Sequence, residues 1–167
     1  FNDTYIPDDN FEQALIDLGY DSGTLDDYVP TANINVITSL DVSSKNITDL
    51  TGIENFIALT SLNVSGNQLV NLDVSANTSL VNLQANNNQL STLNFKNGAN
   101  NGIVNANFNA LNNPNLTCIE VDDATYSTTN WSQIDASASF SENCHYGMTY
   151  VPDDLFESWL INLGYDT

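Results

Sequence analysis

A six-residue pattern of apolar and polar positions recurs along the middle of the chain. Its first, fourth and sixth positions are apolar, and it occurs at residues 37–42, 59–64, 80–85, 103–108 and 116–121. Successive copies begin 22, 21, 23 and 13 residues apart. This spacing predicts short strands with one buried face. A unit of about 21 residues cannot bury its own apolar side, so we expect the strands to stack in parallel.

Turns and further apolar positions follow the two middle strands. Asn67 and Asn88 mark the turns, and the apolar residues after them are Leu69, Leu72, Val74, Leu90, Leu93 and Phe95. The segment Leu-Asn-Val-Ser-Gly-Asn at 62–67 is echoed ten residues later by Leu-Asp-Val-Ser-Ala-Asn at 72–77. The echo predicts that the opposite wall is also extended. We therefore expect a mainly β solenoid with few helices in its repeats.

Residues 37–121 resemble the leucine-rich-repeat family, most closely bacterial surface proteins of the internalin kind and secreted repeat proteins of Bacteroidetes. The turn asparagine of the family, whose side chain bonds to backbone groups inside the coil, matches at Asn67 and Asn88. Lys45 holds that place in the first unit, with Asn46 one step late, and Leu111 holds it in the fourth. The truncated fourth unit predicts an irregular loop around residues 112–114.

A second, longer repeat occurs near both ends of the chain. Residues 4–21 return as residues 149–166, with an offset of 145 throughout. Each copy predicts a short amphipathic helix: aspartates open it, Phe11, Leu15 and Leu18 share one face, and Gly19 ends it. The copies resemble the acidic N-terminal caps of the same Bacteroidetes proteins. We expect the gene product to continue as tandem units.

These repeats predict the organisation of the chain. A leucine-rich-repeat domain spans residues 1–148, with an N-terminal cap at 1–36, repeats at 37–121 and a C-terminal cap at 122–148. Residues 149–167 form a second copy of the cap helix. Its apolar face can dock on a solenoid end of another molecule or fold back on its own repeats. The residues expected to carry assembly are Phe156, Trp159, Leu160 and Leu163.

The composition narrows the choice of partners. The chain has 21 Asp and Glu against 2 Lys and Arg, a formal net charge of -19. Such a surface cannot neutralise phosphates and is repelled by anionic head groups, which argues against nucleic acid and anionic membranes. No apolar run approaches the ~18 residues that a membrane span needs. With 41% hydrophobic residues, the chain still has material for a core.

Two cysteines, Cys118 and Cys144, flank a polar tail that has no repeat of its own. A disulfide between them would tie this tail to the last strand, whereas the alternative is two free thiols. Two cysteines without another metal-ligand pattern are too few for a zinc site. A disulfide implies an oxidising compartment, so we expect secretion or display at the cell surface.

The sequence offers little that indicates an enzyme. His145 is the single histidine and adjoins Cys144. No Gly-x-Ser-x-Gly elbow, phosphate loop or His-Glu-x-x-His pattern occurs. Glycoside hydrolysis needs only two carboxylates and stays open on composition alone. We expect a protein without enzymatic activity.

The acidic pairs of the chain are candidate calcium ligands, because carboxylate oxygens suit that ion. Two of the four pairs open predicted helices, where capping explains them, and none fits an Asp-x-Asp-x-Asp-Gly loop. The best candidates are Asp21, Asp26 and Asp27, around the turn at Gly23. No other cofactor is expected.

The outward positions of the strands form the expected binding face. They are Thr38, Ser39, Asp41, Thr60, Ser61, Asn63, Val81, Asn82, Gln84, Asn105 and Asn107. The row is polar and lacks the Trp, Tyr and Arg that dominate binding hot spots. A scaffold without a dedicated ligand therefore remains an alternative.

Two functional hypotheses follow. The first is a secreted or cell-surface leucine-rich-repeat module for protein interaction, adhesion or self-assembly, without enzymatic activity. The second is a carbohydrate-binding or calcium-dependent accessory module of a secreted degradative protein, with a polysaccharide as its partner.

Overall fold

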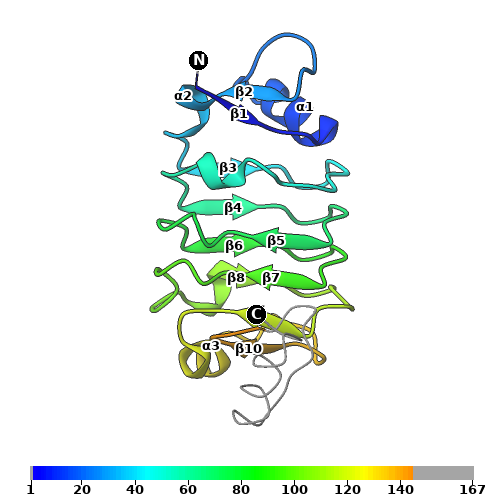
Figure 1. Cartoon of the computed structure of the whole chain (residues 1–167). Coiled ribbons are helices and arrows are strands. Elements are labelled where there is room, and N and C mark those ends of the chain that lie inside the picture. The colour runs from blue at the N-terminus through cyan, green and yellow to red at the C-terminus, as the bar shows by residue number, and fades with distance from the viewer. Residues whose placement is uncertain (1, 145–167) are drawn as a thin grey trace, which may run out of the picture.

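Short parallel strands are stacked in two sheets in a computed structural model, which describes residues 2–144 (Figure 1). Sheet 1 has the order β3-β4-β6-β8, and sheet 2 has the order β10-β9-β7-β5. Sheet 1 consists of β3 (Ser39–Asp41), β4 (Ser61–Asn63), β6 (Asn82–Gln84) and β8 (Phe108–Asn109). Sheet 2 consists of β5 (Asn71–Asp73), β7 (Thr92–Asn94), β9 (Cys118–Glu120) and β10 (Ser139–Ser141).

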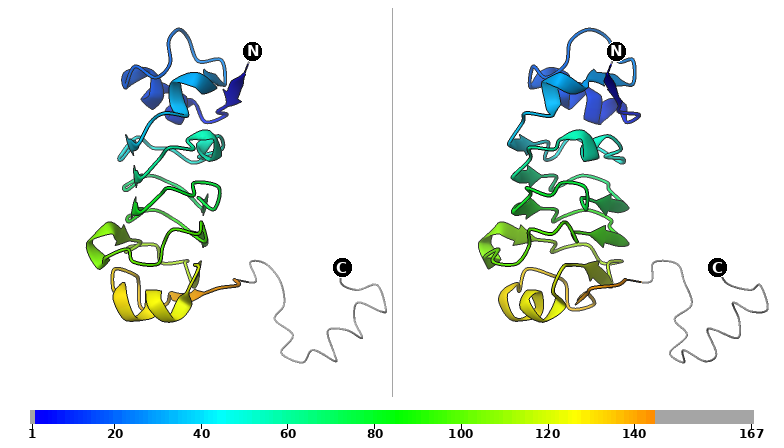
Figure 2. Two further views of the ribbon diagram at one scale, coloured as in Figure 1. Left: turned by 90° about the vertical axis from the view of Figure 1, so that its left-hand side faces the viewer. Right: turned by 60° about the vertical axis from the view of Figure 1, so that its left-hand side comes forward.

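The chain runs from one sheet to the other and back in each coil. Every strand pairs with the strand of the same sheet in the next coil, so that Leu40 lies beside Leu62 and Leu72 beside Leu93. We number the coils along the chain, and the first coil is the one that contains β3. In this coil the 3-10 helix η1 (Ile53–Asn55) takes the place of a strand on the side of sheet 2 (Figure 2). The two sheets form the opposite walls of the stack, as the side views show (Figure 2). The expectation of a mainly β protein with parallel strands and few helices is confirmed.

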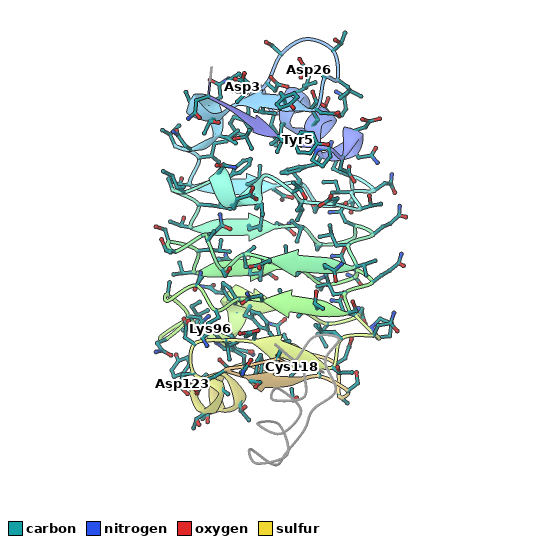
Figure 3. All side chains as sticks on the ribbon, in the orientation of Figure 1. Asp3, Tyr5, Asp26, Lys96, Cys118 and Asp123 are labelled. Atoms are coloured by element: carbon teal, nitrogen blue, oxygen red, sulfur yellow. A yellow bond between two sulfur atoms is a disulfide. The ribbon has the colours of Figure 1, made fainter. Side chains whose placement is uncertain are left out.

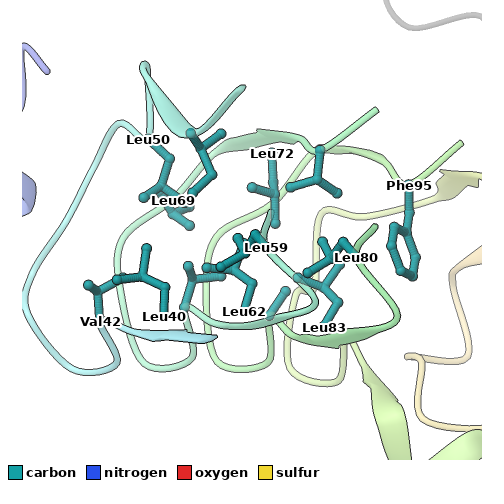
Figure 4. Packing of buried hydrophobic residues seen from close by; sticks show 14 of the residues in the cluster. Leu40, Val42, Leu50, Leu59, Leu62, Leu69, Leu72, Leu80, Leu83 and Phe95 are labelled. Atoms are coloured by element: carbon teal, nitrogen blue, oxygen red, sulfur yellow. The ribbon is translucent and has the colours of Figure 1, made fainter. Parts of the chain in front are cut away.

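The core lies between the two walls. The central residue of every three-residue strand from β3 to β9 is buried, because alternate side chains of a strand point to opposite faces. Leu62 and Leu83 from sheet 1 and Leu72 from sheet 2 point into this core from opposite walls (Figure 4). At the C-terminal end the filling changes to aromatic rings: Phe108 stacks on Trp131 with 4.6 Å between ring centroids.

Residues 2–36 cover the first coil. They form β1 (Asp3–Tyr5) and β2 (Tyr28–Pro30), which pair antiparallel, and the helices α1 (Asp9–Asp17) and α2 (Thr31–Ile34). Phe11 of α1 packs on Phe56 of the first coil, with 6.2 Å between ring centroids. Gly19 follows the helix with φ 79°, as expected for a helix end.

One residue of the expected helix face is misplaced. Phe11 and Leu15 are buried, but Leu18 is 45% exposed. Leu18 is the C-cap of α1 and still bonds to Ala14 O, but at this end of the helix its side chain reaches solvent. The buried face consists of Phe11, Glu12, Ala14 and Leu15.

The fourth repeat has a different register from the one that the sequence pattern predicts. Phe108, rather than Ala106, lies beside Leu83. Residues Asn105–Asn107 form the 3-10 helix η2, so the chain uses two additional residues before β8 begins. The expected outward strand positions Asn105 and Asn107 are therefore not strand residues.

The fifth copy of the pattern belongs to the other sheet. Its strand β9 pairs with β7 of sheet 2, with Ile119 beside Leu93. It begins only 13 residues after the fourth copy, which is about half a coil. The helix α3 (Ala124–Asn130) and strand β10 follow, and β10 adds to sheet 2 beside β9. Within residues 2–144, no helix has the length and apolar character that crossing a membrane requires.

Candidate binding faces

The outer surface of sheet 1 is accessible and polar. Side chains on either side of the buried leucines are exposed or half-buried, in the order that the sequence predicts for the first three strands. They are Thr38, Ser39, Asp41, Thr60, Ser61, Asn63, Val81, Asn82 and Gln84. These residues form what we call the sheet-1 face.

Neighbouring side chains on the sheet-1 face bond to one another. Asn63 Nδ2 donates to Asp41 Oδ2 at 3.1 Å, and Gln84 Nε2 donates to Asn82 Oδ1 at 3.1 Å. Hydrogen bonds from the backbone N–H and then the side chain of Ser43 lower the pKa of Asp41 below its usual value. Burial opposes them more weakly, and the bond from Asn63 lowers the pKa by the least. Asp41 is therefore a fixed negative charge on this face at neutral pH.

Asn105 and Asn107 lie at η2, beyond the regular rows of strands. Asn105 Nδ2 donates to Ser132 Oγ at 3.0 Å, and Asn105 Oδ1 accepts from Ser132 N at 2.7 Å. These contacts attach the C-terminal segment to the fourth coil. The side chain of Asn105 therefore has a structural role, because it links η2 to the segment that follows α3.

A ladder of buried asparagines connects the turns next to sheet 1. Asn67 Oδ1 accepts from the backbone N–H of Lys45 and Ile47, and Asn67 Nδ2 donates to Val42 O and Val64 O. Asn88 and Asn113 repeat this arrangement one and two coils later. The prediction of an irregular loop at 112–114 is wrong at Asn113. This residue is buried, and its side chain makes the same kind of hydrogen bonds as those of Asn67 and Asn88.

A second ladder, near sheet 2, was not recognised from the sequence. Asn97 Nδ2 donates to Asn77 O and Leu80 O, and Asn77 Nδ2 donates to Ile53 O and Phe56 O. The sequence does contain a signal for this ladder: Asn77 ends the six-residue segment that repeats, ten residues later, the segment ending at Asn67. These asparagines satisfy buried carbonyl groups at the turns, so they are structural.

The candidate calcium ligands lie in the loop between α1 and β2. Asp26 Oδ1 accepts from Tyr28 N at 3.0 Å, and the backbone N–H groups of Asp26 and Asp27 donate to the buried carboxylate of Glu12. Asp21 lies on the same loop. In the described part of the chain, no three His, Cys, Asp or Glu side chains come together in a group that could hold a metal ion. Calcium binding stays a prediction.

A shallow hollow of about 230 Å³ opens on the sheet-2 side of the molecule. The hollow has buried apolar side chains beneath it and three carboxylate side chains among its lining residues. The lining residues are Asp49, Leu50, Thr51, Ile53, Glu54, Asn71, Leu72 and Asp73. They come from the first two coils, around η1 and β5.

Cys118 and Cys144 form a disulfide, with 6.0 Å between their Cα atoms. The bond joins β9 to the segment that follows β10, as the sequence predicts. The described residues contain no free cysteine.

Several predicted residues lie outside the described part of the chain. They are His145 and the expected assembly residues Phe156, Trp159, Leu160 and Leu163.

Comparison with known proteins identifies similar solved structures only. No model of a protein family matches the sequence, and no curated protein matches it. The functional domain of InlJ from Listeria monocytogenes, which includes a cysteine ladder, is 30% identical with a TM-score of 0.54. The match covers 71% of this chain and 28% of that one. This chain therefore has an internalin-like fold and spans about a quarter of that structure.

A second solved structure is less similar. It is described as CBM51-2 in complex with GlcNAc and INT domains, from ZmpB of Clostridium perfringens, and is 26% identical with a TM-score of 0.45. The match covers 57% of this chain and 20% of that one.

Proposed function

We propose that this protein is a leucine-rich-repeat module without enzymatic activity, secreted or displayed on a cell surface, that acts through protein contacts in adhesion or assembly. The observation that carries the proposal is the sheet-1 face, a continuous accessible surface built across successive coils. Parallel stacking of repeats creates extended surfaces of this kind, and repeat proteins use them for binding. The 30% identity to the InlJ domain supports the choice of fold family.

In this proposal the chain is a solenoid with ends of different kinds. Residues 1–36 cap the N-terminal end, residues 37–121 carry the repeats, and residues 122–148 cap the C-terminal end. Residues 149–167 are a second copy of the sequence of the N-terminal cap helix. Burial of Phe11 against Phe56 and of Trp131 against Phe108 supports these two caps.

The disulfide supports an extracellular location. Disulfides persist in oxidising compartments and are rare in the reducing cytosol. Cys118 and Cys144 bond across 26 residues, which fits a structural role in holding the C-terminal segment.

A second candidate function is a carbohydrate-binding or calcium-dependent accessory module. Its specific support is a pair of exposed tyrosines, Tyr5 and Tyr28, since aromatic rings with one apolar face suit sugar contacts. Asp21, Asp26 and Asp27 are its proposed calcium ligands.

Binding arrays on the full chain test the two functions. We would probe extracellular proteins and polysaccharides of the source organism and its host surface, with calcium and with chelator. The proposal expects calcium-independent binding to a protein that Ser61→Arg with Asn82→Arg abolishes, because these arginines interrupt the sheet-1 face. Gln68→Arg with Gln89→Arg adds the same charges at exposed turns and serves as the control. Binding to polysaccharides alone, or binding that requires calcium, contradicts the proposal and favours the second function.

A further inference from the structure

The sheet-2 side of the molecule carries an exposed aromatic pair beside the hollow. Tyr5 of β1 and Tyr28 of β2 are cross-strand neighbours, 49% and 51% exposed, with 5.5 Å between ring centroids. Both point outward, since Thr4 and Val29 between the outer positions are buried. Large exposed aromatic residues of this kind are typical of binding hot spots.

The tyrosines and the hollow lie close to each other. Strand β1 and sheet 2 lie on the same side of the molecule in the turned views (Figure 2), and Tyr5 lies above the first coil (Figure 3). The backbone of Tyr5 touches the turn that builds the hollow: a Cβ atom on Gly52 would be 2.7 Å from Tyr5 O. Gly52 stands between Thr51 and Ile53, which both line the hollow. The strand that carries Tyr5 therefore packs directly against the turn that lines the hollow.

The hollow is built to receive a positive charge on an apolar stem. Leu50, Ile53 and Leu72 are buried beneath it and give it an apolar floor. The charged residues that line it are Asp49, Glu54 and Asp73.

Backbone contacts hold the carboxylates of the hollow in place. Asp49 Oδ1 accepts from Thr51 N and Thr51 Oγ1, each at 2.8 Å, while Asp49 Oδ2 has no hydrogen-bond partner among residues 2–144. Gly52 N donates to Glu54 Oε2, and Ser75 N donates to Asp73 Oδ1. Acceptors that are fixed before binding lose less conformational freedom when a ligand arrives.

Neither lysine of this chain neutralises the surface. Lys45 and Lys96 are the only Lys or Arg residues in the sequence. Lys45 Nζ is 3.3 Å from Asp17 Oδ2, and Lys96 Nζ donates to Glu142 O. The charge that complements the hollow must come from a partner.

We propose that the Tyr5–Tyr28 pair and the hollow form a docking site for a Lys- or Arg-bearing segment of a protein partner. A basic side chain lays its aliphatic stem on Leu50 and Leu72 and its charged head near Asp49, while a second cation stacks on a tyrosine ring. The two rings are tilted by 49° to each other, so a flat ligand such as a sugar ring can stack on only one of them at a time, whereas the carboxylates of the hollow favour a cation. This inference names a partner chemistry for the proposed protein-binding function and rests on it.

Peptide binding to the full chain tests the site. The probes are short Lys/Gly and Arg/Gly peptides, the same Lys peptides with acetylated side chains, and a panel of neutral oligosaccharides. We expect the charged peptides to bind, the acetylated ones not to bind, and added salt to weaken binding. Tyr5→Ala with Tyr28→Ala, and Asp49→Asn alone, should each weaken binding by about tenfold. The Asp49→Asn variant should fold, because the asparagine side chain retains an oxygen for the Thr51 contacts.

Matched controls separate the site from general attraction to an acidic protein. Val104→Ala removes another exposed apolar side chain, and Glu142→Gln removes one charge from the C-terminal end. If Glu142→Gln weakens peptide binding as much as Asp49→Asn does, the proposal is wrong. Binding of oligosaccharides in place of the peptides also overturns it. If a protein partner binds the sheet-1 face while these peptides fail to bind, the docking site is wrong and the protein-binding function stands. If neither binds, both are wrong.

Discussion

At the scale of single residues, short polar side chains hold the coils together by bonding to backbone groups. Each coil leaves turn N–H and C=O groups that the sheets cannot pair, and a buried group without a partner is unfavourable. Asn67, Asn88 and Asn113 serve as acceptor and donor at once inside the stack. Aspartates take the same place near the ends, where backbone donors remain: Asp8 at one end and Asp135 at the other.

Asp8 joins the N-terminal helix to the first coil. One carboxylate oxygen accepts from Asn10 N and Phe11 N, and the other accepts from Thr48 N, Thr48 Oγ1 and Asp49 N. Burial raises the pKa of Asp8, but the hydrogen bonds from the Thr48 side chain and from three backbone N–H groups together outweigh it. The pKa of Asp8 is therefore below its usual value.

Replacing Asp8→Asn should destabilise the protein by about 2 to 3 kcal/mol, because an amide N–H would face the donors of Thr48 and Asp49. Since the folded pKa is lowered, the contribution of Asp8 is complete above the ordinary aspartate value of 3.8 and is lost as the pH falls through the folded value. The stability of the Asp8→Asn variant should therefore fall less steeply than that of the parent protein as the pH is lowered through this range. Urea unfolding between neutral and acidic pH measures both effects. Asp9→Asn, which changes an exposed neighbour, should shift stability by under ~1 kcal/mol; equal losses for the two variants would contradict the assignment.

Asn88→Ala should destabilise the protein by about 2 to 4 kcal/mol. The substitution leaves Leu69 N without its acceptor, and it removes one of the two amide donors from each of Val64 O and Ala85 O. Gln89→Ala removes an exposed side chain from the next position and should change stability by no more than ~0.5 kcal/mol. Thermal and urea unfolding compare the two. A stability of Asn88→Ala close to that of Gln89→Ala would show that the ladder contributes little.

At the scale of elements, apolar spacing predicts strands correctly only while coil length stays constant. Strands β3, β4 and β6 lie within the predicted segments because 21 or 22 residues separate them. Two additional residues before β8 shift both the strand and its turn asparagine, so that 25 positions separate Leu83 from Phe108 and also Asn88 from Asn113. The six-residue pattern is the same on both walls, so it could not assign β9 to a sheet.

The candidate sites differ in how far sequence alone could reach them. The sheet-1 face follows from alternation within strands and was predicted for its first three rows. The tyrosine pair and the hollow depend on contacts between residues 5, 28 and 49–73, which only the folding of β1 over the first coil creates. Local spacing carries no information on such contacts.

The disulfide adds a covalent link at the edge of sheet 2. Strand β10 pairs only with β9 among the described strands, and Cys144 follows it by three residues. Closing a loop of this length stabilises by about 3 to 4 kcal/mol in the chain-entropy model. Reductant should therefore lower the free energy of unfolding by that amount, and Cys118→Ser with Cys144→Ser should be insensitive to reductant. Thiol labelling of the unfolded, unreduced protein should find no reactive cysteine; two reactive thiols would contradict the bond.

At the scale of the whole molecule, the two copies of the N-terminal sequence raise the question of assembly. In the first copy Asp8, Phe11 and Leu15 contact or cover the first coil. The second copy has Asp153, Phe156 and Leu160 at the corresponding positions. Leu163 corresponds to the exposed Leu18, so assembly should depend on it less. Trp159 replaces Ala14, which is buried, so the second copy needs a roomier partner surface than the first coil gives to α1.

We therefore predict that the second copy joins molecules head to tail through a heterologous contact, which gives dimers or open chains. Light scattering of the full chain should show a mass that rises with concentration, whereas a version that ends at Gly147 should stay monomeric. Phe156→Ala with Leu160→Ala should act like the truncation, because it removes the apolar face and leaves the length unchanged. Trp159→Ala restores the residue of the first copy and should strengthen assembly if the receiving surface resembles the first coil. Concentration-independent monomers for both the full and the shortened chain would rule out assembly through the second copy in solution.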